Sequence, residues 1–251
     1  MPDLFLSPST QEYNIYYDGS GSEEYYMNRI ADAMEPYLVA SGISFTRNDP
    51  GGTVGSSVRK SNAADYKLHL ALHSNASGSA NYGGQRGCDV YYYQTSTRAK
   101  AAAELFASNL KLIYPDPSKV RTVPTTSLYE LRYTRAVAIL IELAYHDNAS
   151  DAEWIKNNIR PIARNLCISV AEYLGVPFID PSPVRTATVC TGGSNLNLRA
   201  SPSTSADILA SIPNRTKLTV TGGPVSGDGG DWYAVDYNGT SGYVFGRYLR
   251  F

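Results

Sequence analysis

The chain has 251 residues, of which 43% are apolar and 18% are charged, and its formal net charge is −1. A chain of this length and composition is typical of a folded globular protein with one large domain, or with a medium and a small one. The net charge excludes the strong electrostatic attraction to nucleic acid that a basic protein has. Because no run reaches 18 apolar residues, no membrane insertion is expected.

The first 175 residues alternate between extended and helical patterns. Apolar runs predict strands at residues 4–6, 42–46, 67–72, 89–94 and 137–143. Helical patterns occupy residues 23–39, 58–64 and 96–113, and residues 149–174 are expected to form one or two helices. Because strands alternate with helices, we expect an α/β domain with a mainly parallel twisted sheet and helices on both faces.

The composition changes at residues 175–184, where three prolines end a helix and stiffen the chain. Beyond them, six short strand-like runs are separated by turn signals such as Asn238-Gly239. This pattern predicts a small all-β barrel. The predicted organisation is therefore a domain at residues 1–175, a proline-rich linker at residues 176–184 and an all-β domain at residues 185–251.

The cysteines and the amino terminus bear on the compartment. Cys88, Cys167 and Cys190 are odd in number and widely spaced, so we expect no disulfide framework and synthesis in a reducing compartment. The first residues, MPDLFL, lack a basic segment followed by an apolar one, so no signal peptide is expected.

Two segments contain all the histidines, and each is an apolar run that ends in polar groups. KLHLALHSNAS at residues 67–77 includes His73 and Asn75, and AILIELAYHDN at residues 138–148 includes Glu142 and His146. Open α/β sheets place their sites just beyond the carboxyl ends of the strands. A hydrolytic zinc site needs about three ligands, an open position for water and a separate carboxylate that moves the proton. The two segments supply side chains of these types.

Each candidate residue also has a structural interpretation. His73 is either a metal ligand or a histidine satisfied at a strand end. Glu142, whose pKa an apolar run would raise, suits a general acid or base, or is a buried glutamate paired with an arginine. Glu23, on the buried side of its helix, is a metal ligand or a residue favoured by the helix dipole. His69 lies roughly 13 Å from His73 along the strand, so we expect it to pack or to support rather than to bind metal.

Taken together, these segments resemble the zinc-dependent N-acetylmuramoyl-L-alanine amidases, which cut bacterial peptidoglycan between muramic acid and the stem-peptide alanine. The resemblance spans residues 3–175 and rests on the first strand and its turn, on Glu23, and on the segments around His73 and Glu142. It implies that Glu23 and His73 bind Zn²⁺ and that Glu142 is the catalytic acid/base.

One departure concerns the turn after the first strand. The family usually has a zinc-binding histidine there, in a Pro-Gly-His-Gly turn, whereas this chain has SPSTQEYN at residues 7–14. We therefore predict that His146 replaces it, which gives the metal triad Glu23, His73 and His146. Because glutamine is a poor zinc ligand, Gln11 is predicted to support the ligands or to bind substrate. Asn75, two residues after His73, is predicted to have one of the same two roles.

Residues 185–251 resemble bacterial SH3-like cell-wall-binding domains. The resemblance rests on LNLRASPS at residues 196–203, DWYAVDYNG at residues 231–239 and SGYV at residues 241–244. It implies a partner, the peptidoglycan of Gram-positive walls. Trp232 could line a binding groove, but packing in the barrel core is its favoured role.

The two resemblances together predict a peptidoglycan hydrolase of the phage endolysin type, in which the barrel raises the local concentration of the amidase on the wall. Without a signal peptide, we expect a lysin made in the host cytoplasm that then acts on the cell wall; an extracellular enzyme is the alternative. Two other functions stay open: a metal-free, non-catalytic wall-binding protein, and a peptidase that cuts stem peptides.

Overall fold

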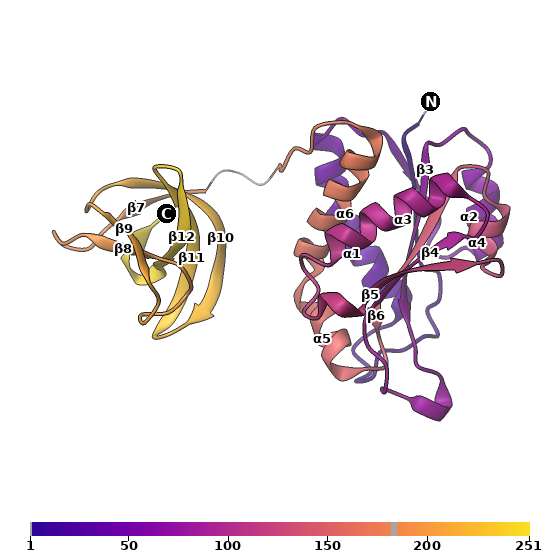
Figure 1. Ribbon diagram of the computed structural model, residues 1–251, viewed down its shortest axis with the longest axis horizontal. Coiled ribbons are helices and arrows are strands. Elements are labelled where there is room, and N and C mark those ends of the chain that lie inside the picture. The colour runs from indigo at the N-terminus through magenta and orange to yellow at the C-terminus, as the bar shows by residue number, and fades with distance from the viewer. Residues whose placement is uncertain (1, 182–184) are drawn as a thin grey trace. The chain divides into compact units, whose positions relative to one another are not determined.

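The computed structural model describes residues 2–181 and 185–251. The chain divides into two compact units, residues 1–181 and residues 182–251 (Figure 1), and each has a hydrophobic core of its own. Part of the predicted linker belongs to the first unit, because Phe178 stacks on Tyr37 with ring centroids 5.8 Å apart and Ile179 N donates to Ser41 Oγ. The rest of the predicted linker, residues 182–184, lies outside the described residues.

The first unit is built on a six-stranded sheet with the order β2-β1-β3-β6-β4-β5. All neighbouring strands are parallel except β4 and β6, so the predicted mainly parallel sheet is confirmed, with one antiparallel junction. The strands are β1 Leu4–Pro8, β2 Phe45–Arg47, β3 Leu68–Asn75, β4 Cys88–Tyr93, β5 Val120–Thr125 and β6 Val137–Tyr145.

Strand β5 was not predicted from the sequence. It contains Pro124, which cannot donate to a neighbouring strand, and it stands at the edge of the sheet, where a missing donor is tolerated.

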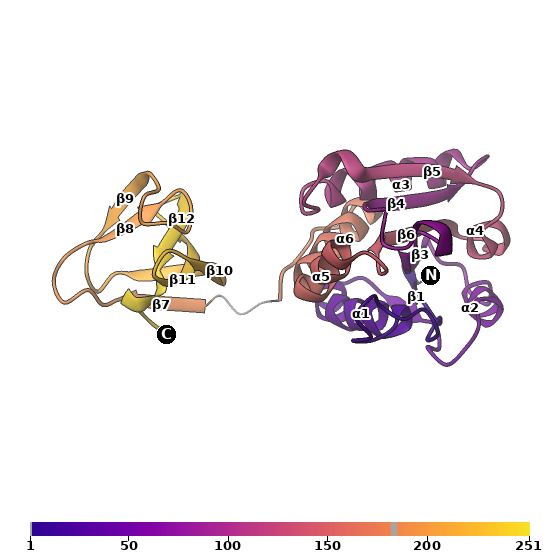
Figure 2. The same ribbon diagram turned by 90° about the horizontal axis from the view of Figure 1, so that it is seen from below.

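Helices cover both faces of this sheet, as predicted (Figure 2). The large core lies on one face and includes residues of α1, α3, α5 and α6. On the other face, α2 and the short α4 lie together over a smaller cluster that includes Ala71, Leu131 and Leu140. The helices are α1 Glu23–Ala40, α2 Val54–Ser61, α3 Thr97–Leu110, α4 Tyr129–Tyr133, α5 Ala149–Asn157 and α6 Ile159–Leu174.

Strand β3 sends its side chains alternately to these two faces. Leu70 and Leu72 belong to the large core, whereas Ala71, which lies between them in sequence, packs against α4. His69 and His73 have the same parity as Ala71. They therefore face the side that, among the described helices, α2 and α4 cover, which leaves room there for a cleft.

The second unit is a seven-stranded antiparallel sheet with the order β13-β7-β10-β11-β12-β8-β9. Trp232 is 2% exposed and its Nε1 donates to the Asp228 carbonyl, so its predicted place in the core is confirmed. All six predicted strand runs lie within these strands: β7 Arg185–Val189, β8 Leu196–Arg199, β9 Ile208–Ile212, β10 Lys217–Gly227, β11 Gly230–Tyr237, β12 Thr240–Phe245 and β13 Leu249–Arg250.

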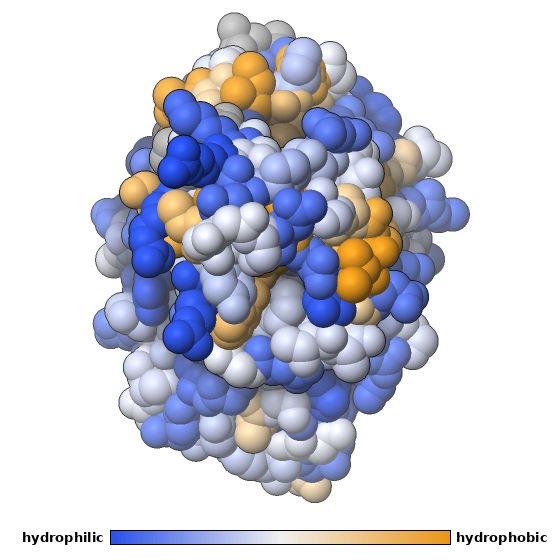
Figure 3. Space-filling model, turned by 90° about the vertical axis from the view of Figure 1, so that its left-hand side faces the viewer, coloured by the Kyte–Doolittle hydropathy of each residue, from blue (hydrophilic) through white to orange (hydrophobic). Residues whose placement is uncertain are grey.

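Surface and composition agree with the globular class. The three cysteines are free, with Cys88 and Cys167 buried and Cys190 exposed. Among the described residues, no helix combines the length and the apolar character needed to cross a membrane. Polar residues predominate on the face shown in Figure 3, where apolar residues form small separate patches.

Candidate active site

A cleft of about 430 Å³ opens at the carboxyl ends of β1, β3 and β6, on the face of the sheet that α2 and α4 cover. The ends of these strands place Ser7, His73 and Glu142 in its wall. Gln11 reaches the cleft from the turn after β1, and Glu130 reaches it from α4. The predicted position of the site, beyond the ends of parallel strands, is where the cleft lies.

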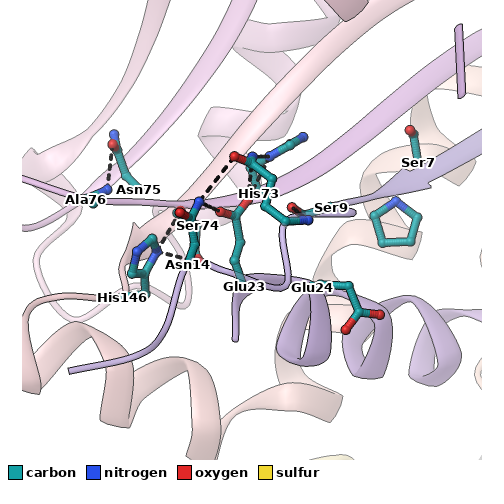
Figure 4. A network of polar contacts seen from close by, with 12 residues as sticks. Ser7, Ser9, Asn14, Glu23, Glu24, His73, Ser74, Asn75, Ala76 and His146 are labelled. Carbon is teal, nitrogen blue, oxygen red and sulfur yellow. Dashed lines mark hydrogen bonds and ion pairs between the residues drawn. The ribbon is translucent and has the colours of Figure 1, made fainter. Parts of the chain in front are cut away.

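Glu23 and His73 are in direct contact, as Figure 4 shows. Ser22 caps α1 by accepting from Tyr25 N, so Glu23 is the first residue of the helix and only 1% exposed. Its Oε1 lies 2.7 Å from His73 Nδ1, and its Oε2 accepts from Asn14 Nδ2 at 2.6 Å. Two of the three predicted metal ligands are thus brought together.

Glu130 contacts the other ring nitrogen of His73. Glu130 Oε2 lies 3.3 Å from His73 Nε2, while its Oε1 accepts from Ser7 Oγ and lies 3.2 Å from His69 Nε2. Burial raises the pKa of Glu130, but the hydrogen bonds from both histidines lower it more, so the carboxylate is ionised. His69 is fully buried and is joined to His73 through Glu130; its supporting role stays a prediction.

Sequence reasoning missed Glu130. Its helix has only five residues, too few for a periodic apolar pattern to indicate it. The one available signal was a glutamate between Tyr129 and Leu131 a short distance before the Glu142 strand.

His73 is held between carboxylates on both sides. Burial lowers the pKa of its imidazole, but Glu130, Glu23 and the nearby Glu142 raise it well above 6.5. In the absence of a metal, this ring therefore binds a proton tightly.

Glu142 lies beside His73 in the sheet, because the two residues are paired in the register of β3 and β6. Its Oε2 is buried and has no hydrogen-bond partner among the described residues. Burial raises the pKa of Glu142 to about 7, although the charge of His73 lowers it. None of the ion pairs within the described ranges includes Glu142, so the alternative of an arginine-paired glutamate is not what the structure shows.

Gln11 faces the Glu23–His73 pair from the turn. Its Nε2 is 3.3 Å from His73 Nδ1 and 3.4 Å from Glu23 Oε1. Its Oε1 accepts from Tyr13 Oη at 3.0 Å and from Asn14 Nδ2 at 3.2 Å. The amide therefore presents its donor group to the pair, on the side where the turn histidine of the family would be expected.

His146 does not join this cluster. Its Nδ1 is 2.8 Å from the Ser74 carbonyl oxygen and 3.1 Å from Ser74 Oγ, and its ring stacks on Tyr16 with centroids 5.6 Å apart. Figure 4 shows His146 directed at Ser74, apart from Glu23 and His73. Across residues 2–181 and 185–251, no group of three or more histidine, cysteine, aspartate or glutamate side chains is arranged to hold a metal ion. The predicted triad is not assembled.

A bulge in β6 explains the position of His146. In a regular strand, residues four apart face the same side, which would place His146 beside Glu142. Instead, Ala144 has a positive φ of 60°, and three steps along β6, from Glu142 to Tyr145, match two along β3, from His73 to Asn75. The extra residue ends the alternation, because Leu143 and Ala144 both belong to the large core.

Asn75 holds the chain where β3 ends. Its Oδ1 accepts from Ala76 N at 2.8 Å, and its carbonyl oxygen accepts from His146 N at 2.9 Å. These contacts support the start of the following loop and do not reach Glu23 or His73.

The contact between Glu23 and His73 shows whether these two side chains could bind a metal ion together. An ionised carboxylate and a neutral imidazole nitrogen are both acceptors, so at 2.7 Å they repel each other unless they share a proton or a cation. Oxygen and nitrogen donors of these types are ligands of zinc. Glu23 and His73 therefore supply two donors of the kinds that zinc binds, whereas His146 adds none.

The first unit is an α/β domain that carries a cluster of carboxylates and an imidazole at the carboxyl ends of its parallel strands, as a hydrolase would. Residues 13–171 match the family model described as N-acetylmuramoyl-L-alanine amidase, and residues 194–250 match the model of the bacterial SH3 domain. The chain belongs to the N-acetylmuramoyl-L-alanine amidase family, and its second unit is a bacterial SH3 domain.

Individual relatives agree with this assignment. The N-acetylmuramoyl-L-alanine amidase LytC of Bacillus subtilis (strain 168) is 28% identical over 166 residues, which are 62% of this chain and 32% of that relative. The match thus spans about a third of the length of LytC.

Solved structures share the fold of the first unit. The catalytic domain of the amidase CwlV from Bacillus (Paenibacillus) polymyxa var. colistinus superposes with a TM-score of 0.60 at 17% identity, covering 70% of this chain and 100% of that domain. The catalytic domain of the CD27L endolysin gives a TM-score of 0.55 at 20% identity, covering 68% of this chain and 97% of that domain. At these identities the likeness shows the fold.

Proposed function

We propose that this protein is a peptidoglycan hydrolase that cleaves the amide bond between N-acetylmuramic acid and the L-alanine of the stem peptide. Family membership supports the reaction, and one observation carries it. Glu142 has a buried carboxyl oxygen that no described residue contacts by a hydrogen bond, and it lies beside the Glu23–His73 pair in an open cleft. A carboxyl group with a pKa of about 7 can both take and give a proton at neutral pH.

We propose that Glu23 and His73 hold Zn²⁺. When bound, zinc would polarise the scissile carbonyl and lower the pKa of a water molecule. Asn14 supports Glu23 by donating to its Oε2, and Gln11 orients the pair by facing both members with its amide nitrogen. His146, the predicted third ligand, is directed at Ser74 and is not included in this site.

Glu142 performs the proton transfers. It accepts a proton from the water that attacks the carbonyl, and it then delivers this proton to the departing alanine nitrogen. The half-buried position of Glu142 keeps bulk water away from one of its oxygens, which favours the protonated form that the second transfer needs.

Digestion of purified Gram-positive cell walls tests the reaction. Mass spectrometry of the products should show intact stem peptides with a free alanine amine, and the Glu142→Gln variant should be slower by about 10²–10⁴-fold. Cuts within the stem peptides would instead indicate a peptidase. Failure of the wild-type protein to release any product with added Zn²⁺ would indicate a non-catalytic wall-binding protein.

We further propose that the SH3 domain tethers the enzyme to the wall. Each unit has its own core, so residues 1–181 can be compared with the full chain. Loss of the tether should slow digestion of intact walls by on the order of 10²-fold. Soluble muropeptides are the control, because their hydrolysis should not change. Equal rates on intact walls would contradict the tethering role.

A lytic role of the phage endolysin type is the finer form of this proposal, and the pairing of an amidase-family domain with an SH3 domain supports it. Expression in the cytoplasm of a Gram-positive host should then lyse the cells only when the membrane is permeabilised. Absence of lysis after permeabilisation would argue against this role.

A further inference from the structure

A single buried carboxylate joins the two histidines of β3. His69 and His73 are four residues apart on one face of the strand, so their rings do not touch. Glu130 bridges them, with Oε1 at 3.2 Å from His69 Nε2 and Oε2 at 3.3 Å from His73 Nε2. We propose that Glu130 is a positioning residue that fixes the ring of His73, with Nδ1 directed at Glu23 and the cleft.

The donors and acceptors around Glu130 form one consistent set. Glu130 is 3% exposed, and as a carboxylate it can only accept. Ser7 Oγ and His69 Nε2 therefore donate to its Oε1, and His73 Nε2 donates to its Oε2. His69 Nδ1 is then free to accept from Ser61 Oγ at 2.9 Å. Of the four ring nitrogens of His69 and His73, three thus have a donor or acceptor role within this buried set, and His73 Nδ1 is the fourth.

The packing of α4 places Glu130 where it can bridge the histidines. Leu131, the next residue, packs in a cluster with Ala71, which lies midway between His69 and His73 on the same face of β3. A small side chain at position 71 lets the short helix approach the strand. The neighbouring glutamate can then reach both histidines.

A fixed proton on His73 Nε2 has a consequence for Nδ1. His73 Nδ1 lies 2.7 Å from Glu23 Oε1. In the proposed function, these two atoms would bind zinc. Without Glu130, Nε2 would lose the acceptor that it has in the structure, and the ring could turn away from Glu23. Carboxylates that hold a metal-binding histidine in this way typically contribute 10- to 100-fold to metal affinity.

Two measurements on Glu130→Gln and Glu130→Leu test this inference, which rests on the proposed role of His73. The first is the zinc dissociation constant by competition with a chromogenic chelator, expected to rise roughly 10- to 100-fold, more for leucine than for glutamine. The second is solvent exchange of the His73 Nε2 proton by NMR. Exchange should be slow in the wild-type protein and fast in Glu130→Leu, with or without zinc.

Asp151→Asn is the matched control. Asp151 is also a fully buried carboxylate, but it contacts Arg86 and Tyr114 instead of a histidine. Its loss should lower the unfolding temperature without changing zinc affinity or the exchange of the His73 proton. If the Glu130 variants do not fold, the milder Ser7→Ala variant decides, because it removes one donor to Glu130 Oε1. Faster exchange in Ser7→Ala would support the inference.

Unchanged zinc affinity together with unchanged proton exchange in a folded Glu130→Gln or Glu130→Leu variant, or in Ser7→Ala if neither folds, would overturn the positioning role. Failure of the proposed function gives a different result. In that case the wild-type protein would bind no zinc and release no alanine amines, while the exchange of the His73 proton would still depend on Glu130.

Discussion

His73 and Ser74 are neighbours in β3, yet they face two different environments. His73 faces a cleft in which Glu23, Glu130 and Glu142 surround its ring, and its side chain is 13% exposed. Ser74 faces the opposite side, where it contacts His146 and Tyr16 in a buried, hydrogen-bonded cluster. One step along a strand therefore separates two clusters that each contain a histidine.

The two sides differ in how completely their polar groups are satisfied. On the Ser74 side, His146 has a carbonyl and a hydroxyl as partners and a tyrosine ring against its face. On the His73 side, Glu142 has an oxygen with no partner among the described residues, and the ring of His73 lies between the carboxylates of Glu23 and Glu130. A buried polar group without a hydrogen-bond partner destabilises a purely structural cluster, whereas in an active site it is available for the reaction. Four predictions test this contrast.

The largest effect is expected for His73→Ala. Loss of this ring should weaken zinc binding by more than the 10- to 100-fold that is typical of an outer-sphere partner, and wall digestion should become unmeasurable. Zinc content of the purified variant, measured by mass spectrometry, checks this expectation. Full zinc content in a folded His73→Ala variant would show that the metal binds elsewhere.

The pH dependence of the unfolding temperature should reveal the raised pKa of Glu142. Its pKa is about 7 in the folded protein against an ordinary value of 4.5, so the folded state holds this proton more tightly. The resulting stabilisation is complete below pH 4.5 and is lost as the pH rises through about 7. Unfolding temperatures measured in chelator from pH 4 to 8 should show Glu142→Gln gaining on the wild-type protein as the pH rises. Parallel curves would contradict the raised pKa.

His146→Ala should change stability rather than chemistry. Removal of the buried ring breaks its contacts with Ser74 and Tyr16, at a cost of about 1–3 kcal/mol in the free energy of unfolding. Zinc content and the products of wall digestion should be those of the wild-type protein. A zinc-free His146→Ala variant would restore the triad predicted from the sequence.

The smallest effect is expected for Ser74→Ala. This change removes one hydroxyl, 3.1 Å from His146 Nδ1, while the Ser74 carbonyl still accepts from that ring. Denaturant unfolding should show a loss of about 0.5–1.5 kcal/mol with no change in turnover. A drop in turnover would mean that the two sides of β3 are coupled.

Most of the fold follows from local patterns in the sequence. Apolar runs and helical spacing locate β3, β6 and α1, and the short runs after residue 185 locate the strands of the second unit. Elements that lack such patterns were missed: α4 is a single short turn of helix, and β5 contains a proline. Both are defined by the tertiary structure around them.

Residue type and position in a helix or strand are sufficient to predict which groups meet at the cleft. Glu23 and His73 meet because one begins a helix and the other ends a strand at the same edge of the sheet. Glu130 was not predicted because its role depends on how α4 packs. His146 was predicted as a ligand because the turn histidine is missing; the structure directs it at Ser74, just beyond a residue at which the backbone departs from strand alternation.

That bulge at Ala144 has a consequence for how related chains can vary. The extra residue separates Glu142 from the segment that leads to Asn148, the cap of α5, and to the helix itself. Pairing resumes past it, because Tyr145 pairs with Asn75, and Tyr145, His146 and Asp147 are all buried, so the chain is held on both sides of the bulge. Changes of length in related chains are therefore expected outside residues 142–148, so that the carboxyl group of Glu142 keeps its place beside the cleft.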